Sequence, residues 1–185
     1  MMNVTSLRLE TGTDTGVLFD RDDLIRCATG DLFGAGYARL PAPPMLMLHQ
    51  VSLVDEQGGD SGCGYTEGSV LIDSSQWYFE SHFVGCPVMP GSLILEAMWQ
   101  LGGFFGAYAG YKGGCRVISG GDAQFRNAVT PATVQTELLL KIHIRKIKKV
   151  KQNTYIVADA YADHLGKCIC RCSGMKLGLF SDFVA

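Results

Sequence analysis

One long apolar stretch dominates the hydrophobic pattern of the chain. It covers residues 87–111 and is interrupted by Glu96, Gln100 and several glycines, so it predicts a buried central helix over residues 92–109 and no membrane span. The glycines and alanines that follow Leu101 lower helix propensity. They are expected where a sheet approaches the helix closely, and the alternative is a helix that frays after Leu101.

Around this stretch the pattern predicts one shorter helix and a series of strands. Asp20, with Asp22 and Asp23 behind it, indicates a helix start, and Gly30 can end that helix. Apolar stretches between polar or glycine-rich turns predict strands over residues 45–54, 65–72, 115–118, 123–125, 133–147, 154–161 and 167–179. One long helix among many strands predicts an α+β fold with an antiparallel sheet wrapped around the helix.

The first 19 residues are polar and lack this patterning. They contain no basic segment followed by an apolar one, so they are not a signal peptide. We interpret residues 1–19 as a polar leader and residues 20–185 as a single domain, because 185 residues can bury one sizeable core.

Composition and charge narrow the functional class. Hydrophobic residues make up 47% and charged residues 18%, which is typical of a globular protein. The net charge of −2 argues against a nucleic-acid partner. The seven cysteines form no CxxC pair and have no histidine at zinc-ligand spacing. We interpret them as reduced thiols of a cytoplasmic protein, with a metal or redox role as the alternatives.

A histidine, a rigid turn and a helix-borne acid lie within residues 82–96. His82 supplies a base, and the prolines and glycines after it hold the backbone in a fixed irregular path. The N–H of Gly91, at the start of the helix, can bind negative charge on a thioester oxygen. The alternative is that Pro90 and Gly91 only start the helix.

Glu96 is the only ionised side chain between Ser81 and Lys112. A carboxyl group among apolar neighbours can keep its proton and act as a general acid. Gln100 lies one turn further along the same helix face and can orient it. A base, an oxyanion donor and an acid are what elimination of water from an acyl thioester requires.

The run HFVGCPVMPGSLILEAMWQ, residues 82–100, resembles the β-hydroxyacyl-acyl carrier protein dehydratases of bacterial fatty acid synthesis. It is most similar to the β-hydroxydecanoyl dehydratase/isomerase, or FabA-type, branch. Further similar segments, in order, are Asp31-Leu32-Phe33-Gly34, Leu40-Pro41-Ala42-Pro43, Trp77-Tyr78-Phe79, residues 125–131 and residues 176–180.

This resemblance implies a hotdog fold and a homodimer whose active site is shared between subunits. It implies that His82 of one subunit and Glu96 of the other remove water from a (3R)-3-hydroxyacyl thioester. The Val88 carbonyl would orient the imidazole and Gly91 would bind the thioester oxygen. Acyl carrier protein is the implied partner, and no metal or organic cofactor is needed.

Two features separate this chain from that branch. Glu96 stands where the dehydratase/isomerases typically carry Asp, and Ser92 and Ile94 are also unusual there. Dehydration is expected to survive, because Glu and Asp have similar acidity, whereas trans-2 to cis-3 isomerisation stays open. A hotdog thioesterase and a non-catalytic acyl-binding subunit are the rival interpretations. The first does not need this run, and the second would be expected to lose His82 or Glu96.

Six basic residues gather in residues 141–151. On a strand they would point outward and prevent edge-to-edge aggregation. The resemblance favours a second role, because acyl carrier protein is acidic. The candidate docking residues, which we call the basic patch, are Arg145, Lys146, Lys148, Lys149 and Lys176.

Overall fold

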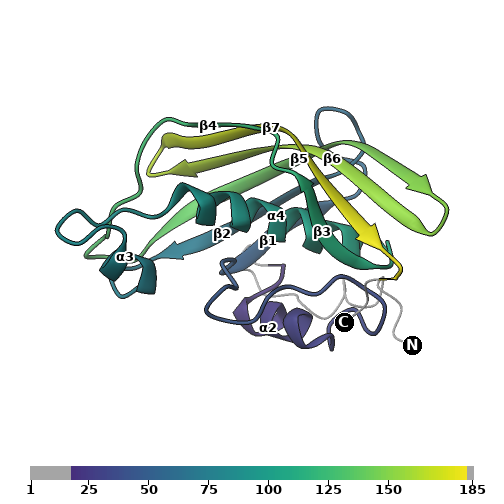
Figure 1. Cartoon of the computed structure of the whole chain (residues 1–185), viewed down its shortest axis with the longest axis horizontal. Coiled ribbons are helices and arrows are strands. Elements are labelled where there is room, and N and C mark those ends of the chain that lie inside the picture. The colour runs from purple at the N-terminus through teal and green to yellow at the C-terminus, as the bar shows by residue number, and fades with distance from the viewer. Residues whose placement is uncertain (1–17, 183–185) are drawn as a thin grey trace.

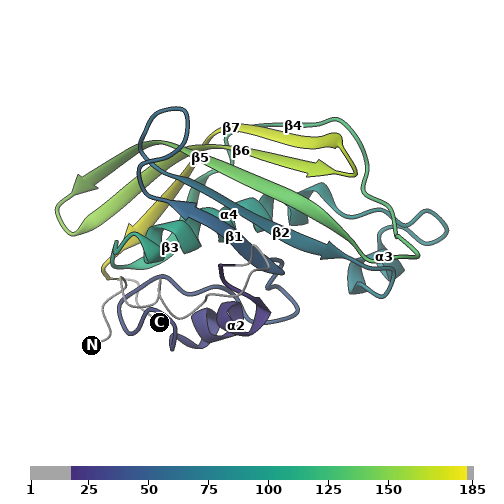
Figure 2. The same ribbon diagram turned by 180° about the vertical axis from the view of Figure 1, so that it is seen from behind.

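The computed structural model describes residues 18–182. An antiparallel sheet curves over one long helix, α4, as Figures 1 and 2 show from opposite sides. The strand order is β1-β2-β5-β6-β7-β3, and β4 also pairs with β7. The elements in chain order are α2 (Arg21–Thr29), β1 (Gln50–Asp55), β2 (Tyr65–Ile72), α3 (Trp77–Ser81), α4 (Gly91–Tyr108), β3 (Gly114–Ser119), β4 (Asp122–Phe125), β5 (Thr136–Val150), β6 (Asn153–His164) and β7 (Lys167–Phe180). The predicted α+β hotdog fold is confirmed.

Helix α4 is buried because the sheet approaches it closely on its glycine-rich side. A Cβ atom added at Gly102 would lie 2.7 Å from Cδ1 of Leu177, and one at Gly106 would lie 3.2 Å from Cδ1 of Ile156. The helix continues to Tyr108 without fraying after Leu101. Close packing against the strands therefore outweighs the poor helix propensity of the glycines.

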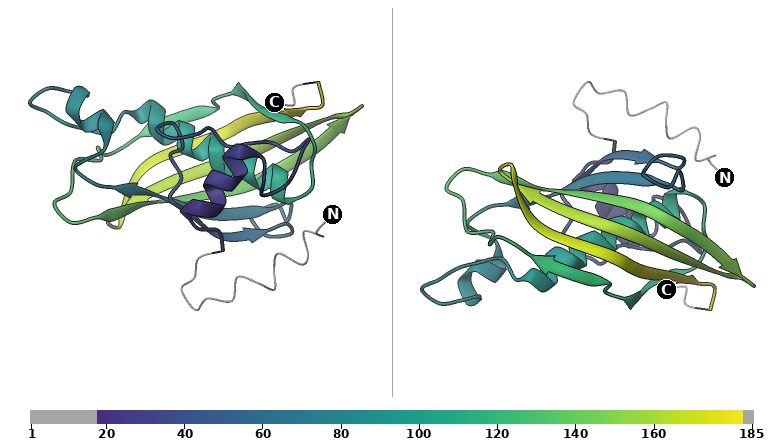
Figure 3. Two further views of the ribbon diagram at one scale, coloured as in Figure 1. Left: turned by 90° about the horizontal axis from the view of Figure 1, so that it is seen from below. Right: turned by 90° about the horizontal axis from the view of Figure 1, so that it is seen from above.

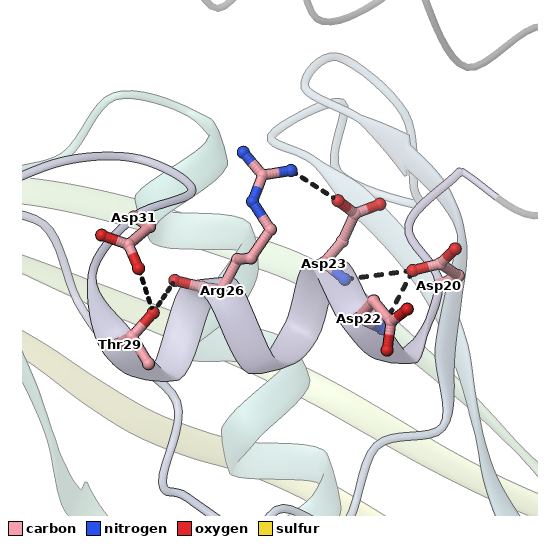
Figure 4. Close-up of polar contacts among 6 residues, drawn as sticks. All are labelled: Asp20, Asp22, Asp23, Arg26, Thr29 and Asp31. Atoms are coloured by element: carbon pink, nitrogen blue, oxygen red, sulfur yellow. Dashed lines mark hydrogen bonds and ion pairs between the residues drawn. The ribbon is translucent and has the colours of Figure 1, made fainter.

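Helix α2 begins and ends as its sequence predicts. The Asp20 carboxylate accepts hydrogen bonds from the backbone N–H groups of Asp22 and Asp23, both at 3.0 Å, as Figure 4 shows. Such a cap stabilises a helix by about 1 kcal/mol. Gly30 ends the helix with φ of 89°, which favours glycine. The helix lies on the side of α4 away from the sheet (Figure 3).

The strand predicted over residues 45–54 begins only at Gln50. The residues before it have an irregular path because their backbone groups form hydrogen bonds with the Gln100 side chain. Its Oε1 accepts from Met47 N–H at 2.9 Å, and its Nε2 donates to the Met45 carbonyl at 2.7 Å. The short helix α3 was not predicted, and it lies where the sequence is aromatic-rich.

The N-terminal leader predicted over residues 1–19 falls mostly on residues 1–17, which lie outside the described part of the chain. Its last member, Phe19, is only 4% exposed and belongs to the core. The backbone of Phe19 bridges to Val51 in β1, and its ring packs edge-on against Phe104 of α4 at 5.1 Å between centroids. The folded domain therefore includes Phe19.

Strand β3 forms one edge of the sheet. Within residues 18–182 it pairs with β7 alone, so in this part of the chain it is an edge strand. Val117 and Ile118 on this strand are 42% and 47% exposed. An apolar edge strand of this kind is suited to pairing with another strand.

Candidate functional site

His82 ends helix α3 and begins the loop that leads to α4. The loop is closed by backbone hydrogen bonds, from Val88 N–H to the His82 carbonyl at 2.7 Å and between Phe83 and Cys86 in both directions. Gly85 has φ of 79°, which favours glycine at this turn. The imidazole is partly buried and stacks on the Phe83 ring at 4.0 Å between centroids. The loop thus fixes the ring in one place.

One hydrogen bond decides which imidazole nitrogen is available. Nδ1 of His82 lies 3.0 Å from the Val88 carbonyl oxygen. A carbonyl can only accept, so Nδ1 carries the proton and donates it. In the neutral ring Nε2 then keeps its lone pair, and this nitrogen is the one that can act as a base.

Gly91 is the first residue of α4. Its backbone N–H makes no hydrogen bond within residues 18–182, as expected for the first turn of a helix. The residue must be small, because a Cβ atom there would lie 2.8 Å from Cε1 of Phe125. A free N–H at the positive end of the helix dipole can bind developing negative charge.

Glu96 lies one turn further along α4 and is tied to Gln100. Nε2 of Gln100 donates to Oε1 of Glu96 at 2.9 Å. Gln100 is only 5% exposed, and its bonds to Met45 and Met47 fix which end of the amide faces Glu96. The carboxyl group is therefore held in one orientation, with Oε2 left outside this network.

A pocket opens beside Glu96, between α4, the edge strand β3 and the segment that follows α2. Its walls are largely apolar, and Arg39, Glu96 and Gln100 supply polar groups. The lining residues are Cys27, Ala38, Arg39, Leu40, Pro41, Glu96, Trp99, Gln100, Gly103, Phe104, Cys115, Val117 and Leu177. A mostly apolar hollow with few fixed polar groups suits a ligand with an acyl chain.

The structure does not bring His82 and Glu96 together within one chain. No hydrogen bond or ion pair between residues 18–182 joins them, and His82 is absent from the lining of the pocket that contains Glu96. Sequence spacing groups the two residues, whereas the resemblance implies an active site shared between subunits. The fold gives two half-sites, one with His82, Val88 and Gly91 and one with Glu96 and Gln100.

The basic patch occupies the sheet near the turn between β5 and β6. A β-bulge next to Arg145 breaks the strand alternation, so Arg145 and Lys146 are both exposed. Arg145 pairs with Asp159 at 3.4 Å, and Lys149 lies 5.1 Å from the centre of the Tyr111 ring. Figure 1 shows the β5–β6 turn and α3 at opposite ends of the molecule. This end of the patch is therefore remote from His82 of the same chain.

Several pocket residues escape prediction from the sequence. Cys27 and Arg39 come from the segment before β1, and Cys115 comes from the edge strand. No motif marks them. The one available signal is Gly103, whose missing side chain leaves space that a neighbouring strand must fill. The structure shows that Cys115 fills it, with Sγ 3.1 Å from the position of a Cβ at Gly103.

No helix in the described range 18–182 combines the length and apolar character needed to cross a membrane.

Comparison with known proteins identifies the family. Residues 40–173 match the family model of the FabA-like domain. Among solved structures, the dehydratase heterocomplex ApeI:P from Xenorhabdus doucetiae is similar, with a TM-score of 0.56 and 13% identity over 75% of this chain and 85% of that chain. Cj0977, a sigma28-regulated virulence protein from Campylobacter jejuni, has a TM-score of 0.54 and 10% identity, over 89% of this chain and 94% of that chain.

At these identities the solved structures support the fold alone. The family-model match supports family membership, because it covers well over half of the chain and includes both half-sites. The chain therefore belongs to the FabA-like family of hotdog-fold dehydratases.

Proposed function

We propose that the protein removes water from (3R)-3-hydroxyacyl thioesters carried on acyl carrier protein, giving trans-2-enoyl thioesters for fatty acid synthesis. The observation that carries this proposal is the hydrogen bond from His82 Nδ1 to the Val88 carbonyl, which leaves Nε2 as a base. The loop that holds this base ends at the free N–H of Gly91. Glu96, in an apolar pocket, supplies the acid.

The proposed reaction uses one base, one acid and one oxyanion donor. Nε2 of His82 takes a proton from C2, and the electrons of that C–H bond form the C2–C3 double bond as the C3–O bond breaks. Gly91 N–H stabilises charge on the thioester oxygen. Glu96 gives its proton to the departing hydroxyl, which leaves as water. A proton must then return from His82 to Glu96, and no metal or organic cofactor takes part.

The proposed active site needs two subunits. His82 and Glu96 belong to separate half-sites in one chain, and β3 presents an apolar edge. Antiparallel pairing of two β3 edges around a twofold axis would place the α3 end of one chain beside the β5–β6 end of its partner. His82 of one subunit would then face the pocket with Glu96 of the other.

The same pairing supports the basic patch as the docking surface for acyl carrier protein. Lys148 and Lys149, near the turn between β5 and β6, lie far from α3 and His82 of their own chain. The proposed twofold dimer would bring them toward His82 of the partner. An acidic carrier docked there would deliver its acyl group to a composite site. Lys149 is already held over Tyr111, which lowers the entropy that ordering it costs.

A reducing compartment fits the thiols. All seven cysteines are free, and Cys170 and Cys172 are buried residues of β7. Free buried thiols are typical of the cytoplasm, which we propose as the location of the enzyme.

The direct test is incubation of the purified protein with 3-hydroxydecanoyl-acyl carrier protein in the presence of a chelator, followed by product analysis. A trans-2-enoyl product supports the proposal. Additional cis-3-enoyl product shows that isomerisation survives with Glu96 in place of Asp. Release of free 3-hydroxydecanoic acid would instead identify a thioesterase, and an unchanged substrate with tight binding would identify an acyl-binding subunit.

A further inference from the structure

The pocket beside Glu96 extends along one face of α4. Glu96, Gln100 and Gly103 recur at the spacing that places residues on the same side of a helix. The seven residue steps from Glu96 to Gly103 span about 10 Å at 1.5 Å per residue. The pocket therefore has a polar end at Glu96 and an apolar end beside Gly103 and Phe104.

Cys115 forms the wall at the apolar end. It lies on β3, opposite Leu179 of β7, and its Sγ occupies the space that Gly103 leaves on the helix. Leu177 and Phe104 complete this part of the pocket. The Cys115 side chain fills the gap between the helix and the edge strand at this point, with its Sγ 3.1 Å from the position of a Cβ at Gly103.

The Cys115 thiol stays neutral at physiological pH. Burial and, secondarily, Glu96 in its ionised form raise its pKa to about 12. A neutral thiol behaves as a small apolar group and is a poor nucleophile. Cys115 is therefore suited to contact a hydrocarbon chain without attacking the thioester.

We propose that Cys115 determines the acyl chain length that the enzyme accepts. This rests on the proposed dehydratase function, because the C3 hydroxyl of the substrate must meet Glu96. With C3 held there, the carbon chain beyond it runs along α4 toward Gly103 and ends against Cys115. A smaller residue at 115 lengthens this channel, and a larger one shortens it.

The test compares kcat/KM for a series of 3-hydroxyacyl thioesters of increasing chain length in three proteins. Cys115→Gly is expected to raise the ratio of long-chain to short-chain kcat/KM by about tenfold or more, and Cys115→Leu to lower it by a similar factor. One methylene group in an apolar pocket changes discrimination by about 10- to 200-fold. The shortest substrate is expected to keep its wild-type kcat/KM.

Cys170→Ala is the matched control, because Cys170 is buried in β7 but does not line the pocket. It is expected to leave the chain-length profile unchanged. If the Cys115 variants are folded, by thermal melting, and change all chain lengths equally or not at all, the proposal is wrong. A wild-type protein that dehydrates no 3-hydroxyacyl thioester would overturn the proposed function instead, so the two failures are distinct.

Discussion

At the scale of single residues, the candidate acid depends on one amide. The side-chain carbonyl of Gln100 accepts a hydrogen bond from Met47 N–H. Its amide nitrogen donates to the Met45 carbonyl and to the Glu96 carboxylate. The spacing of Glu96 and Gln100 was enough to predict their contact, because residues four apart share a helix face. The two methionines could not be predicted, since a loop 53 residues earlier in the chain carries no pattern that points to Gln100.

Glu96→Gln is expected to slow water loss by about 10²- to 10⁴-fold, which is the contribution of a general acid. The new amide can still accept a hydrogen bond from Gln100, so the structure is retained and only the transferable proton is lost. The rate is measured with 3-hydroxydecanoyl-acyl carrier protein, and folding is checked by thermal melting.

Glu80→Gln is the control for that substitution. Glu80 is exposed on α3, next to the loop that carries His82, and is expected to leave the rate unchanged. His82→Ala is expected to abolish water loss with the fold intact. A wild-type rate for Glu96→Gln would mean that another group supplies the proton.

At the scale of elements, the central contact is between α4 and the sheet. The glycines of the helix indicated this contact, and the structure confirms it at Gly102 and Gly106. The predicted start of β1 was wrong by five residues. The apolar sequence pattern continues back into a segment whose backbone forms hydrogen bonds with the Gln100 side chain. Helix α3 has only five residues, too few for a helical period to be recognised.

Gly68→Ala is expected to lower the free energy of unfolding by about 1–3 kcal/mol, the usual cost of overpacking. Its Cβ would lie 2.8 Å from the Gln50 carbonyl oxygen of β1, a backbone atom held by the strand, and 3.3 Å from Cδ1 of Leu101. Urea unfolding followed by circular dichroism measures the change.

Gly120→Ala is the matched control. The nearest atom to its Cβ is Cζ2 of Trp99 at 3.6 Å, an ordinary contact, and its φ is not in the left-handed region. A change within about 0.5 kcal/mol is expected. Equal stability of the Gly68 and Gly120 variants would show that the sheet shifts to accommodate a methyl group at Gly68, contrary to the prediction.

At the scale of the whole molecule, the fold separates what the sequence groups together. Residues 82–96 are continuous in the chain, yet His82 and Glu96 fall in different half-sites. Sequence spacing could not reveal this, because it measures distance along the chain and not the path of the loop between α3 and α4. In the proposed dimer, the edge of β3 is the surface through which a second chain completes the site.

Reversing two charges of the basic patch, with Lys148→Glu and Lys149→Glu together, is expected to weaken binding of acyl carrier protein. The loss should be larger at low salt, because screening acts over about 8 Å at physiological ionic strength. Lys167→Glu with Arg171→Glu makes the same charge change on β7, outside the basic patch, and is expected to have little effect. Equal affinities of the two double variants for acyl carrier protein, measured by calorimetry, would exclude the basic patch as the docking surface.

The most direct test of the shared dehydratase site mixes two inactive variants. His82→Ala and Glu96→Gln subunits, co-expressed with different tags, form heterodimers in which one of the two sites has both His82 and Glu96. Random assembly then restores about a quarter of the wild-type sites. The mixture is expected to recover about a quarter of the wild-type rate of trans-2-enoyl formation from 3-hydroxydecanoyl-acyl carrier protein. A mixture as inactive as its two components, beside an active wild type, would show that the site is not shared between subunits.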